Sequence, residues 1–298
     1  MNFPPKGEDF VTSGWIKLLR TLPIGTHGKW RLARRLIRQH LAMRDVPIRD
    51  KFGCVYTVPC LQEPIGFSLL VDGVYEPQLI QAAFNLLKPG SVVVDVGASI
   101  GAFTLPICTA VGSTGTVLAI EASPSIYPYL RGNVRANNLQ NVILENCAVA
   151  DRDNQDVDFY EAPIDHFGMG SLAPQFHDQP IRVPSATLDA LLLKYNLSHV
   201  DVVKVDVEGY EAAVFSGAQK LLSSKRAPTV FFEFADWAET RRPGGHASDS
   251  QEILRAFGYK IWPLSSFSRK REPQKGVIAK GFQTLVGVKQ GPREGSFG

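Results

Sequence analysis

The stretch VVVDVGASIGAFT, residues 92–104, joins an apolar run of strand length to a turn that contains two glycines. Consecutive valines are typical of a strand that is buried on both faces of a sheet. Gly97 allows the chain to turn sharply, and Gly101 allows the backbone to pass close to a ligand where a helix begins. The first N–H groups of that helix favour a negatively charged group, such as a carboxylate or a phosphate. The stretch therefore predicts a strand, a ligand-binding turn and a helix.

The sequence on both sides alternates strand-like and helix-like segments. Apolar runs of strand length occur at 92–94, 117–120, 142–144, 200–205, 229–232 and 282–288. Most of them are separated by helix-like segments at 102–111, 125–137, 211–222 and 248–257. This alternation predicts an α/β protein with a Rossmann-like, doubly wound and mainly parallel sheet. The pattern loosens between residues 156 and 185, which predicts an insertion that carries specificity.

The remaining zones lie before and after this core. Residues 1–50 predict a basic helical extension, and residues 51–90 predict a strand pair and a helix that lead into the core domain at 91–289. That helix ends at Pro89–Gly90, which is a strong stop signal. Residues 290–298 predict a flexible tail.

Composition argues against several classes of protein. Of the 298 residues, 44% are hydrophobic and 20% are charged, which does not suit a disordered, collagen-like or integral membrane protein. The four cysteines form no Cys-x-x-Cys pair, so we expect buried thiols in a reducing compartment. The first nine residues lack the apolar run of a secretory signal. We therefore expect a cytoplasmic location.

The net charge of +3 is unevenly distributed along the chain. Residues 1–50 contain ten Lys and Arg against four Asp and Glu, whereas the rest of the chain contains 22 against 25. Between residues 29 and 41, basic residues are mixed with leucines near helical spacing. Such a helix either contacts an anionic membrane or nucleic acid, or packs on the main domain and leaves its charges in water. Peripheral membrane contact through residues 1–50 is thus one of the alternatives.

The glycine turn favours one class of cofactor. Its spacing is Gly-x-x-x-Gly with Asp95 two residues ahead, and it differs from the Gly-x-Gly-x-x-Gly turn that binds a dinucleotide pyrophosphate. Glu121 ends the next strand, where a carboxylate can accept both hydroxyls of a ribose. Together these features predict a nucleoside that carries an amino-acid tail and no pyrophosphate. S-adenosylmethionine fits this description.

At this point the sequence resembles the FkbM family of S-adenosylmethionine-dependent methyltransferases. The resemblance extends from Tyr75 to Val288 and includes GVYEP at 73–77, DVGASIG at 95–101, EASP at 121–124, NN at 137–138, TLD at 187–189, VKVDVEGYE at 203–211, GA at 217–218 and the segment 228–233. It implies a Rossmann-like methyltransferase fold and O-methylation of natural products or sugars. Residues 1–50 and the tail are not needed for this match.

The resemblance also implies which residues bind the cofactor. Asp95, Gly97 and Gly101 would form the loop around its methionine part, and Glu121 would bind the ribose. Tyr75 and Glu76 would close over its amino group, although a glutamate at a helix start is also favoured by the helix dipole. Ala148 would lie near the adenine, although small residues are common at strand ends.

Two carboxylates are the candidate catalytic residues. Asp206 ends the fourth strand and Glu233 the fifth, and the carboxyl ends of parallel strands face the ligand crevice. Two neighbouring carboxylates would orient and deprotonate the acceptor hydroxyl or would hold a divalent cation. Glu208 and Glu211, at the start of the following helix, either share in these roles or only stabilise the helix N-terminus. No His or Cys motif supports a zinc site, so we assign no metal ligands, and a divalent cation on these carboxylates stays an alternative. His166, in the insertion, is a further candidate base or an ordinary loop histidine.

The sequence therefore predicts an O-methyltransferase that acts on a hydroxyl of a sugar, glycolipid or secondary metabolite. We expect a small-molecule or glycan acceptor rather than nucleic acid, because the Asn-Pro-Pro-Tyr and Asp-Pro-Pro-Tyr motifs of enzymes that methylate the amino groups of bases are missing. Two alternatives remain open. One is a nucleotide-dependent oxidoreductase on the same fold, and the other is a non-catalytic module that binds a membrane or nucleic acid through residues 1–50.

Overall fold

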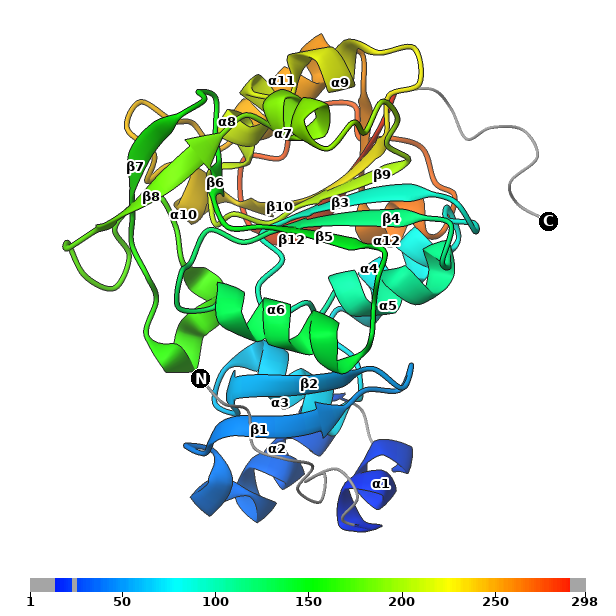
Figure 1. The fold of residues 1–298 in the computed structure, drawn as a ribbon, viewed down its shortest axis with the longest axis vertical. Coiled ribbons are helices and arrows are strands. Elements are labelled where there is room, and N and C mark those ends of the chain that lie inside the picture. Colours follow the sequence, from blue (N-terminus) through cyan, green and yellow to red (C-terminus); the bar gives the residue numbers. More distant parts are fainter. Residues whose placement is uncertain (1–13, 23–25, 290–298) are drawn as a thin grey trace.

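The computed structural model describes residues 14–22 and 26–289, and its centre is a seven-stranded sheet (Figure 1). The strands follow the order β11 (Lys260–Pro263), β12 (Phe282–Val288), β10 (Thr229–Ala235), β9 (Val202–Val205), β3 (Val92–Val96), β4 (Thr116–Ile120) and β5 (Val142–Glu145). The five strands from β10 to β5 are parallel, whereas β12 is antiparallel to both of its neighbours. The predicted α/β class with a mainly parallel sheet is confirmed.

Helices cover both faces of this sheet (Figure 1). One face carries α4 (Pro77–Phe84), α5 (Thr104–Val111), α6 (Tyr127–Ala136) and α12 (Leu264–Phe267), and the other carries α7 (Leu188–Lys194), α8 (Glu211–Ser216), α9 (Gln219–Ser223) and α11 (Asp249–Ala256). Val93 packs into the core under the first group, and its neighbour Val94 packs into the core under the second. The valine run is continuous because successive side chains of β3 enter these two cores alternately. None of the helices in the described part of the chain is long and apolar enough to span a membrane.

The segment before the sheet differs from the prediction in two respects. The strand pair, β1 (Arg44–Arg49) and β2 (Val55–Cys60), is antiparallel and begins before residue 51. The apolar run after it forms helix α3 (Pro64–Val71), whose first turn is capped by Glu63 through a hydrogen bond from the Ile65 N–H. Every residue from 65 to 71 is buried, so the run has no polar face from which a helical period could be recognised.

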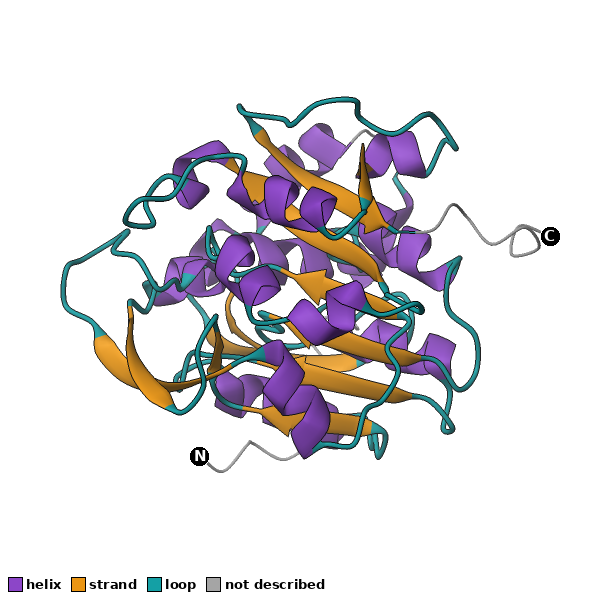
Figure 2. Ribbon diagram, turned by 90° about the horizontal axis from the view of Figure 1, so that it is seen from above, coloured by secondary structure: helices purple, strands orange, loops and turns teal. Residues whose placement is uncertain are grey.

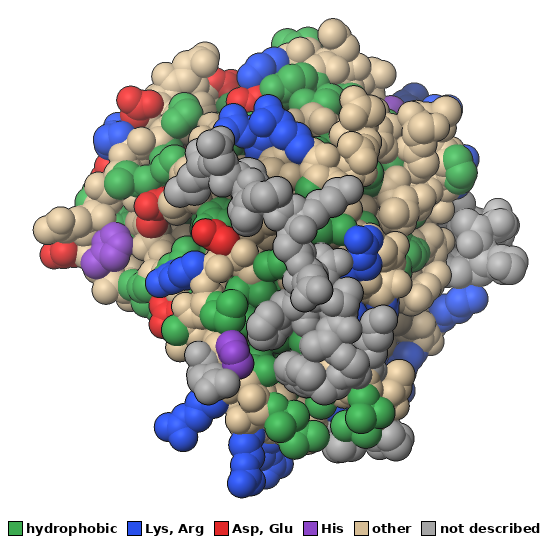
Figure 3. Space-filling model, turned by 60° about the horizontal axis from the view of Figure 1, so that its bottom comes forward, with side chains coloured by type: hydrophobic (Ala, Val, Ile, Leu, Met, Phe, Trp, Pro, Cys, Tyr) green, Lys and Arg blue, Asp and Glu red, His purple; other side chains and the backbone are tan. Residues whose placement is uncertain are grey.

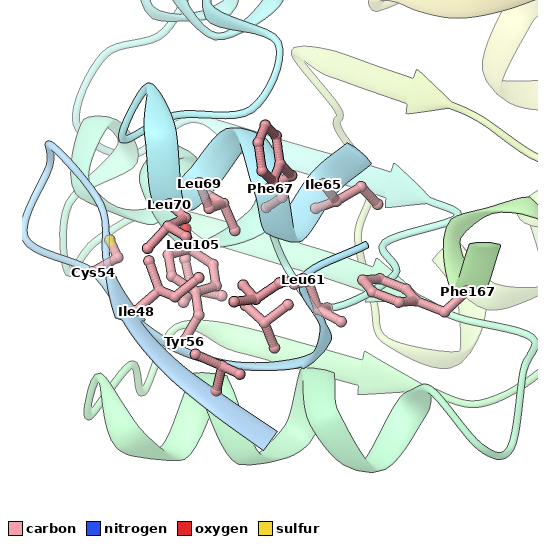
Figure 4. Packing of buried hydrophobic residues seen from close by; sticks show 14 of the residues in the cluster. Ile48, Cys54, Tyr56, Leu61, Ile65, Phe67, Leu69, Leu70, Leu105 and Phe167 are labelled. Carbon is pink, nitrogen blue, oxygen red and sulfur yellow. The ribbon is translucent and has the colours of Figure 1, made fainter. Parts of the chain in front are cut away.

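The hairpin, α3 and the main domain share one apolar core. Figure 4 shows part of this cluster, with Ile48 and Tyr56 from the hairpin, Leu70 from α3, Leu105 from α5 and Phe167 from the 3-10 helix η3 (Ile164–Met169). Helices α1 (Gly14–Thr21) and α2 (Thr26–Leu36) pack against α3 and lie at the lower end of the molecule in Figure 1. The first 13 residues of the predicted extension and the predicted tail at 290–298 lie outside the described residues.

Asn133 of α6 and Asn137, at the C-terminal end of that helix, pair with the backbone of β2. Asn137 accepts a hydrogen bond from the Val55 N–H at 2.8 Å and donates one to the Val55 carbonyl at 2.6 Å. Asn133 repeats this pattern on Thr57, at 2.7 and 3.3 Å. Each side-chain amide thus takes the place of a neighbouring strand and bonds the hairpin to the main domain.

The predicted insertion forms a small sheet of its own. Its strands are β6 (Ala148–Val149), β8 (Ile181–Ala186) and β7 (Gln155–Phe159) in spatial order, and β7 and β8 extend from one side of the molecule (Figure 2, left). Helix η3 lies between β7 and β8 in the chain, and its residues return to the carboxyl ends of the parallel strands.

Candidate active site

A cavity of about 360 Å³ opens at the carboxyl ends of the parallel strands. Residues that follow β3, β4 and β9 contribute to its wall, and α3 and η3 complete it. Open parallel sheets bind their ligands in this crevice. Of the predicted site residues, the following line the cavity: Tyr75, Glu76, Gly97, Glu121, Ala148, Asp206 and Glu233.

The turn after β3 lies directly against the end of β9. Gly97 has a φ of +79°, and a Cβ atom at this position would lie 1.8 Å from the Asp206 carbonyl oxygen. The turn is fixed to β4, because the Gly97 and Ala98 N–H groups both donate to the Ile120 carbonyl, at 3.0 and 2.9 Å. Only glycine meets both requirements, and the missing side chain brings Asp206 up to the turn.

The variant Gly97→Ala should be strongly destabilised. It forces an L-residue into the left-handed region and also drives a methyl group into a backbone oxygen, so we expect a loss of about 3–5 kcal/mol in urea unfolding. Gly53→Ala is the matched control, because Gly53 has a φ of +89° and nothing within 4 Å of its Cβ position. The control should lose only about 1–2 kcal/mol. Equal losses in the two variants would show that the contact with Asp206 does not constrain the turn.

Glu121 follows β4 at once and is nearly buried. Its Oε2 accepts a hydrogen bond from the Ser99 N–H and its Oε1 accepts one from the Ser123 N–H, both at 2.8 Å. Burial raises the pKa of Glu121 to about 7, although these hydrogen bonds oppose the rise. The Ser99 Oγ is buried beside it with no hydrogen-bond partner among the residues that the structure describes. Glu121 and Ser99 both line the cavity, and together they fit a ligand with adjacent hydroxyl groups.

Asp95 and Gly101 support the turn from behind. Asp95 is fully buried, where its Oδ2 accepts a hydrogen bond from the Thr104 hydroxyl at 2.6 Å and its Oδ1 lies 3.7 Å from the Lys204 Nζ. A Cβ atom at Gly101 would lie 2.5 Å from the Leu105 Cδ1. Neither residue is in the cavity lining that the described residues form. Both therefore position the turn without facing the ligand space.

Three carboxylates converge on the same cavity. Asp206, Glu208 and Glu233 each offer an oxygen that lies within 4.8 Å of the other two. The Lys204 Nζ donates to the Asp206 Oδ2 at 3.0 Å, whereas the carboxylate of Glu233 has no hydrogen bond within the described part of the chain. Such a group of oxygens can accept a proton or can coordinate a divalent cation.

Burial raises the pKa of most of these acids. The pKa of Glu233 lies well above its ordinary value, first because the side chain is buried and next because Asp206 is negatively charged. The same two causes raise the pKa of Glu76 to about 7 and that of Glu208 to about 8. Asp206 is the acid that has Lys204 as an ion-pair partner. Burial therefore favours the protonated forms of Glu76, Glu208 and Glu233, and Asp206 lies against the Lys204 ammonium.

These shifts predict that the ligand-free protein loses stability as the pH rises. A carboxyl whose pKa is raised from 4.5 to 7 or 8 binds more protons in the folded state, so its stabilising contribution is present below pH 4.5 and is lost as the pH rises through 7 to 8. We expect the Tm to fall by a few degrees between about pH 6 and pH 8. Glu208→Gln should reduce this fall, and the exposed control Glu272→Gln should not. A Tm that rises over this range would contradict the shifts.

Two aromatic side chains stand at the mouth of the cavity. Trp237, on α10 (Asp236–Glu239), is 42% exposed, and Phe282 is 66% exposed, yet both contribute to the lining. The residues that precede them are joined by two hydrogen bonds. The Gly281 N–H donates to the Asp236 Oδ2 at 3.1 Å, and the Asp236 N–H donates to the Gly281 carbonyl at 3.2 Å. Aromatic rings beside carboxylates suit a ligand that has both an apolar face and hydroxyl groups.

His166 does not reach the cavity. Its Nδ1 lies 3.3 Å from the Asp165 Oδ1, both side chains are about half exposed, and its ring packs 5.3 Å from that of Phe176. The next two residues, Phe167 and Gly168, line the wall instead.

Among the lining residues that sequence analysis missed are Glu63, Lys204, Trp237 and Phe282. Lys204 could have been found, because a cation between the valines of a buried strand needs an anionic partner. Glu63 carried the signal of a helix cap before Pro64. The exposed aromatic residues carried no signal in the sequence.

Relatives found by sequence comparison match only a short part of the chain. A stretch of 78 residues is 33% identical to the 23S rRNA (uracil(1939)-C(5))-methyltransferase RlmD of Acinetobacter baumannii strain SDF and covers 26% of this chain and 17% of that protein. The protein of the same description from Acinetobacter baylyi is 33% identical over 93 residues, which cover 29% and 20%. The chain thus spans at most a fifth of the length of these curated relatives.

Solved structures resemble this chain only distantly. An S-adenosylmethionine-dependent O-methyltransferase from Thermotoga maritima is 14% identical, with 84% of this chain and 80% of that chain covered and a TM-score of 0.40. TYW2 of M. jannaschii in complex with AdoMet is 16% identical, with 83% and 86% covered and a TM-score of 0.39. Scores this low do not support an argument about function.

A protein-family comparison covers the candidate site itself. The family model described as the methyltransferase FkbM domain matches residues 95–261, which is more than half of the chain. The matched range contains the Gly97 turn, Glu121, Asp206 and Glu233. The match supports the methyltransferase prediction and does not support the oxidoreductase alternative. The chain belongs to the FkbM family of S-adenosylmethionine-dependent methyltransferases.

Proposed function

We propose that the protein methylates a hydroxyl oxygen of a sugar, glycolipid or secondary metabolite. One observation carries the proposal: a single cavity brings the Gly97 turn and Glu121 together with Asp206, Glu233 and the aromatic side chains of the mouth. The groups that would bind the cofactor and the carboxylate that would accept the proton thus share one cavity, which is what direct transfer between two bound molecules requires.

The cavity wall has groups that fit S-adenosylmethionine. Glu121 would accept the ribose hydroxyls, and the Gly97 turn would let the backbone lie against the methionine part. Ala148 would leave room for the adenine, and Tyr75 and Glu76 would face the amino group. When bound, S-adenosylmethionine supplies a methyl group that its sulfonium already activates, so the chain has only to align the acceptor oxygen and exclude water.

Asp206 would act as the general base in this proposal. Asp206 accepts a hydrogen bond from the Lys204 Nζ at 3.0 Å, and its carboxylate would take the proton from the acceptor hydroxyl as that oxygen gains the methyl group. Glu233, whose pKa is raised by burial and by Asp206, would be protonated at neutral pH and would donate a hydrogen bond that orients the acceptor. The two acids would then have separate roles because their environments differ.

The same acids would serve differently if they bound a divalent cation. In the general-base arrangement, we expect methyl transfer to be unchanged after treatment with EDTA and removal of the chelator. If chelation abolished activity and Mg²⁺ or Mn²⁺ restored it, the general-base arrangement would be replaced by a mechanism in which Asp206, Glu208 and Glu233 hold a cation. A sample that receives buffer without metal after the EDTA treatment is the control for loss of activity during the treatment.

The proposal is tested by transfer of labelled methyl groups from the cofactor into fractionated cell extract. We expect label in the glycan, lipid or small-molecule fraction with the wild-type chain and with the exposed control Asp156→Ala, and none with Asp206→Ala. The curated relatives act on 23S rRNA, so RNA is the second candidate acceptor. Label that is released by ribonuclease would overturn the proposed acceptor class and leave the methyltransferase assignment in place.

A further inference from the structure

The outward side of helix α2 combines unpaired cations with exposed leucines. Arg31, Leu32, Arg35 and Leu36 form this α2 outer face, because residues four apart lie on the same side of a helix. Leu32 is 37% exposed and Leu36 is 55% exposed. Figure 3 shows Lys and Arg side chains close to hydrophobic ones at the lower edge of this end of the molecule. Exposed leucines that are grouped and flanked by cations indicate a binding surface.

The inner side of α2 is fixed, so these leucines cannot turn inward. Ala33 and Ile37 are buried in the core. The Trp30 Nε1 donates to the Asp72 Oδ2 at 2.7 Å, and the Arg34 guanidinium lies 5.0 Å above the ring of Phe67. Helix α1 is anchored in turn by Arg20, which donates to the Leu69 and Leu70 carbonyls of α3. These contacts hold α2 in one orientation, and the α2 outer face therefore stays exposed to solvent.

The stretch of sequence that contains this face carries charges of a single sign. Residues 10–44 contain eight Lys and Arg and no Asp or Glu. Arg31 and Arg35 form no ion pair with any residue in the ranges 14–22 and 26–289. The cations therefore remain available to an external anion, and no acidic side chain in this part of the sequence competes for them.

We propose that the α2 outer face docks the protein on an anionic lipid bilayer. Phosphates of a nucleic acid would pair with the arginines but would leave Leu32 and Leu36 in water. A membrane surface accepts both kinds of group, because lipid headgroups pair with the cations while the leucines enter the acyl boundary. The inference is independent of the methyl acceptor, although glycolipids would be within reach of a protein that is held at such a surface.

The test measures binding of the full chain to lipid vesicles. Vesicles of phosphatidylcholine with about one-third phosphatidylglycerol should bind the protein, and vesicles of phosphatidylcholine alone should bind it weakly. The pair Leu32→Ser with Leu36→Ser keeps every charge and should weaken binding about tenfold or more. The pair Arg31→Gln with Arg35→Gln should weaken it by a similar factor, and added salt should weaken wild-type binding but have less effect on this pair.

Matched controls come from the far side of the sheet and from the surface after β11. Leu193→Ser removes a leucine of α7 that is 76% exposed, and Lys275→Gln with Lys280→Gln removes two exposed cations. These variants should bind as the wild type does, and the Tm of every variant should be unchanged. The proposal would be overturned if the wild type did not bind the vesicles, or if the variant Leu32→Ser with Leu36→Ser bound them as strongly as the wild type does. It would also be overturned if the leucine pair abolished a dimer in solution while vesicle binding persisted, or if the chain bound an RNA oligonucleotide and no vesicles.

Discussion

Asp206→Asn should reduce the rate of methyl transfer by about 10²–10⁴-fold while the Kd for the cofactor changes little. The amide keeps the shape of the side chain and can still accept a hydrogen bond from Lys204, but it cannot take a proton from the acceptor. The measurement is the rate of label transfer into the acceptor fraction, together with calorimetry of cofactor binding. Asp206 is a suitable target because its backbone already contacts the Gly97 turn, so an isosteric change disturbs that contact least.

Asp156→Asn is the matched control for this change. It also converts an aspartate into an asparagine, but on the exposed strand β7 and outside the cavity lining. The control should retain full activity. If Asp206→Asn kept more than about a tenth of the wild-type rate, proton removal by Asp206 would not limit the reaction, and the base would have to be sought among Glu76 and Glu233.

Glu121→Gln should weaken cofactor binding about 100-fold or more. The carboxylate accepts hydrogen bonds from the Ser99 and Ser123 N–H groups, and its remaining lone pairs would accept the ribose hydroxyls. An amide has one oxygen only, so its NH₂ group must face one of these N–H donors and the charge-assisted bonds to the ribose are lost. Calorimetry with S-adenosylmethionine and with its demethylated product measures the change in Kd.

Glu145→Gln is the control, since Glu145 lies at the end of the next strand and binds Lys194 and Tyr195 away from the cavity. Its Kd should equal that of the wild type. An unchanged Kd in Glu121→Gln would remove Glu121 from the cofactor site and would leave its two N–H bonds as a structural feature of the turn.

The strands of the main sheet could be predicted because strands that are buried on both faces have a recognisable pattern in the sequence. Runs such as Val92–Val94 and Val202–Val205 contain little but β-branched residues. Helix α3, within the range 51–90 for which a strand pair and one helix were predicted, was missed because a short segment that is buried on every side has no period. The break between α8 and α9 was missed as well, because Gly217 ends the helix where it meets the Ala150 carbonyl, a contact between distant parts of the chain.

The residues of the candidate site also divide into those that could be predicted from the sequence and those that could not. Residues that follow strand ends, such as Glu121 and Asp206, could be placed in advance, because parallel strands bring their carboxyl ends to one edge. Phe282 reaches the cavity because β12 pairs with β10, and nothing in its local sequence indicates that pairing. The depth of Asp95 and the outward position of His166 likewise depend on packing that spacing alone does not specify.

The two asparagines that bond β2 to the main domain limit how this protein can be divided. Asn133 and Asn137 lie inside the range 95–261 that matches the family, but their partners Thr57 and Val55 lie outside it. A fragment cut to the matched range would leave both amides without their partners and would remove α3 from the wall of the cavity. The smallest unit fit for expression and assay therefore begins no later than β1, well before the segment by which the family is recognised.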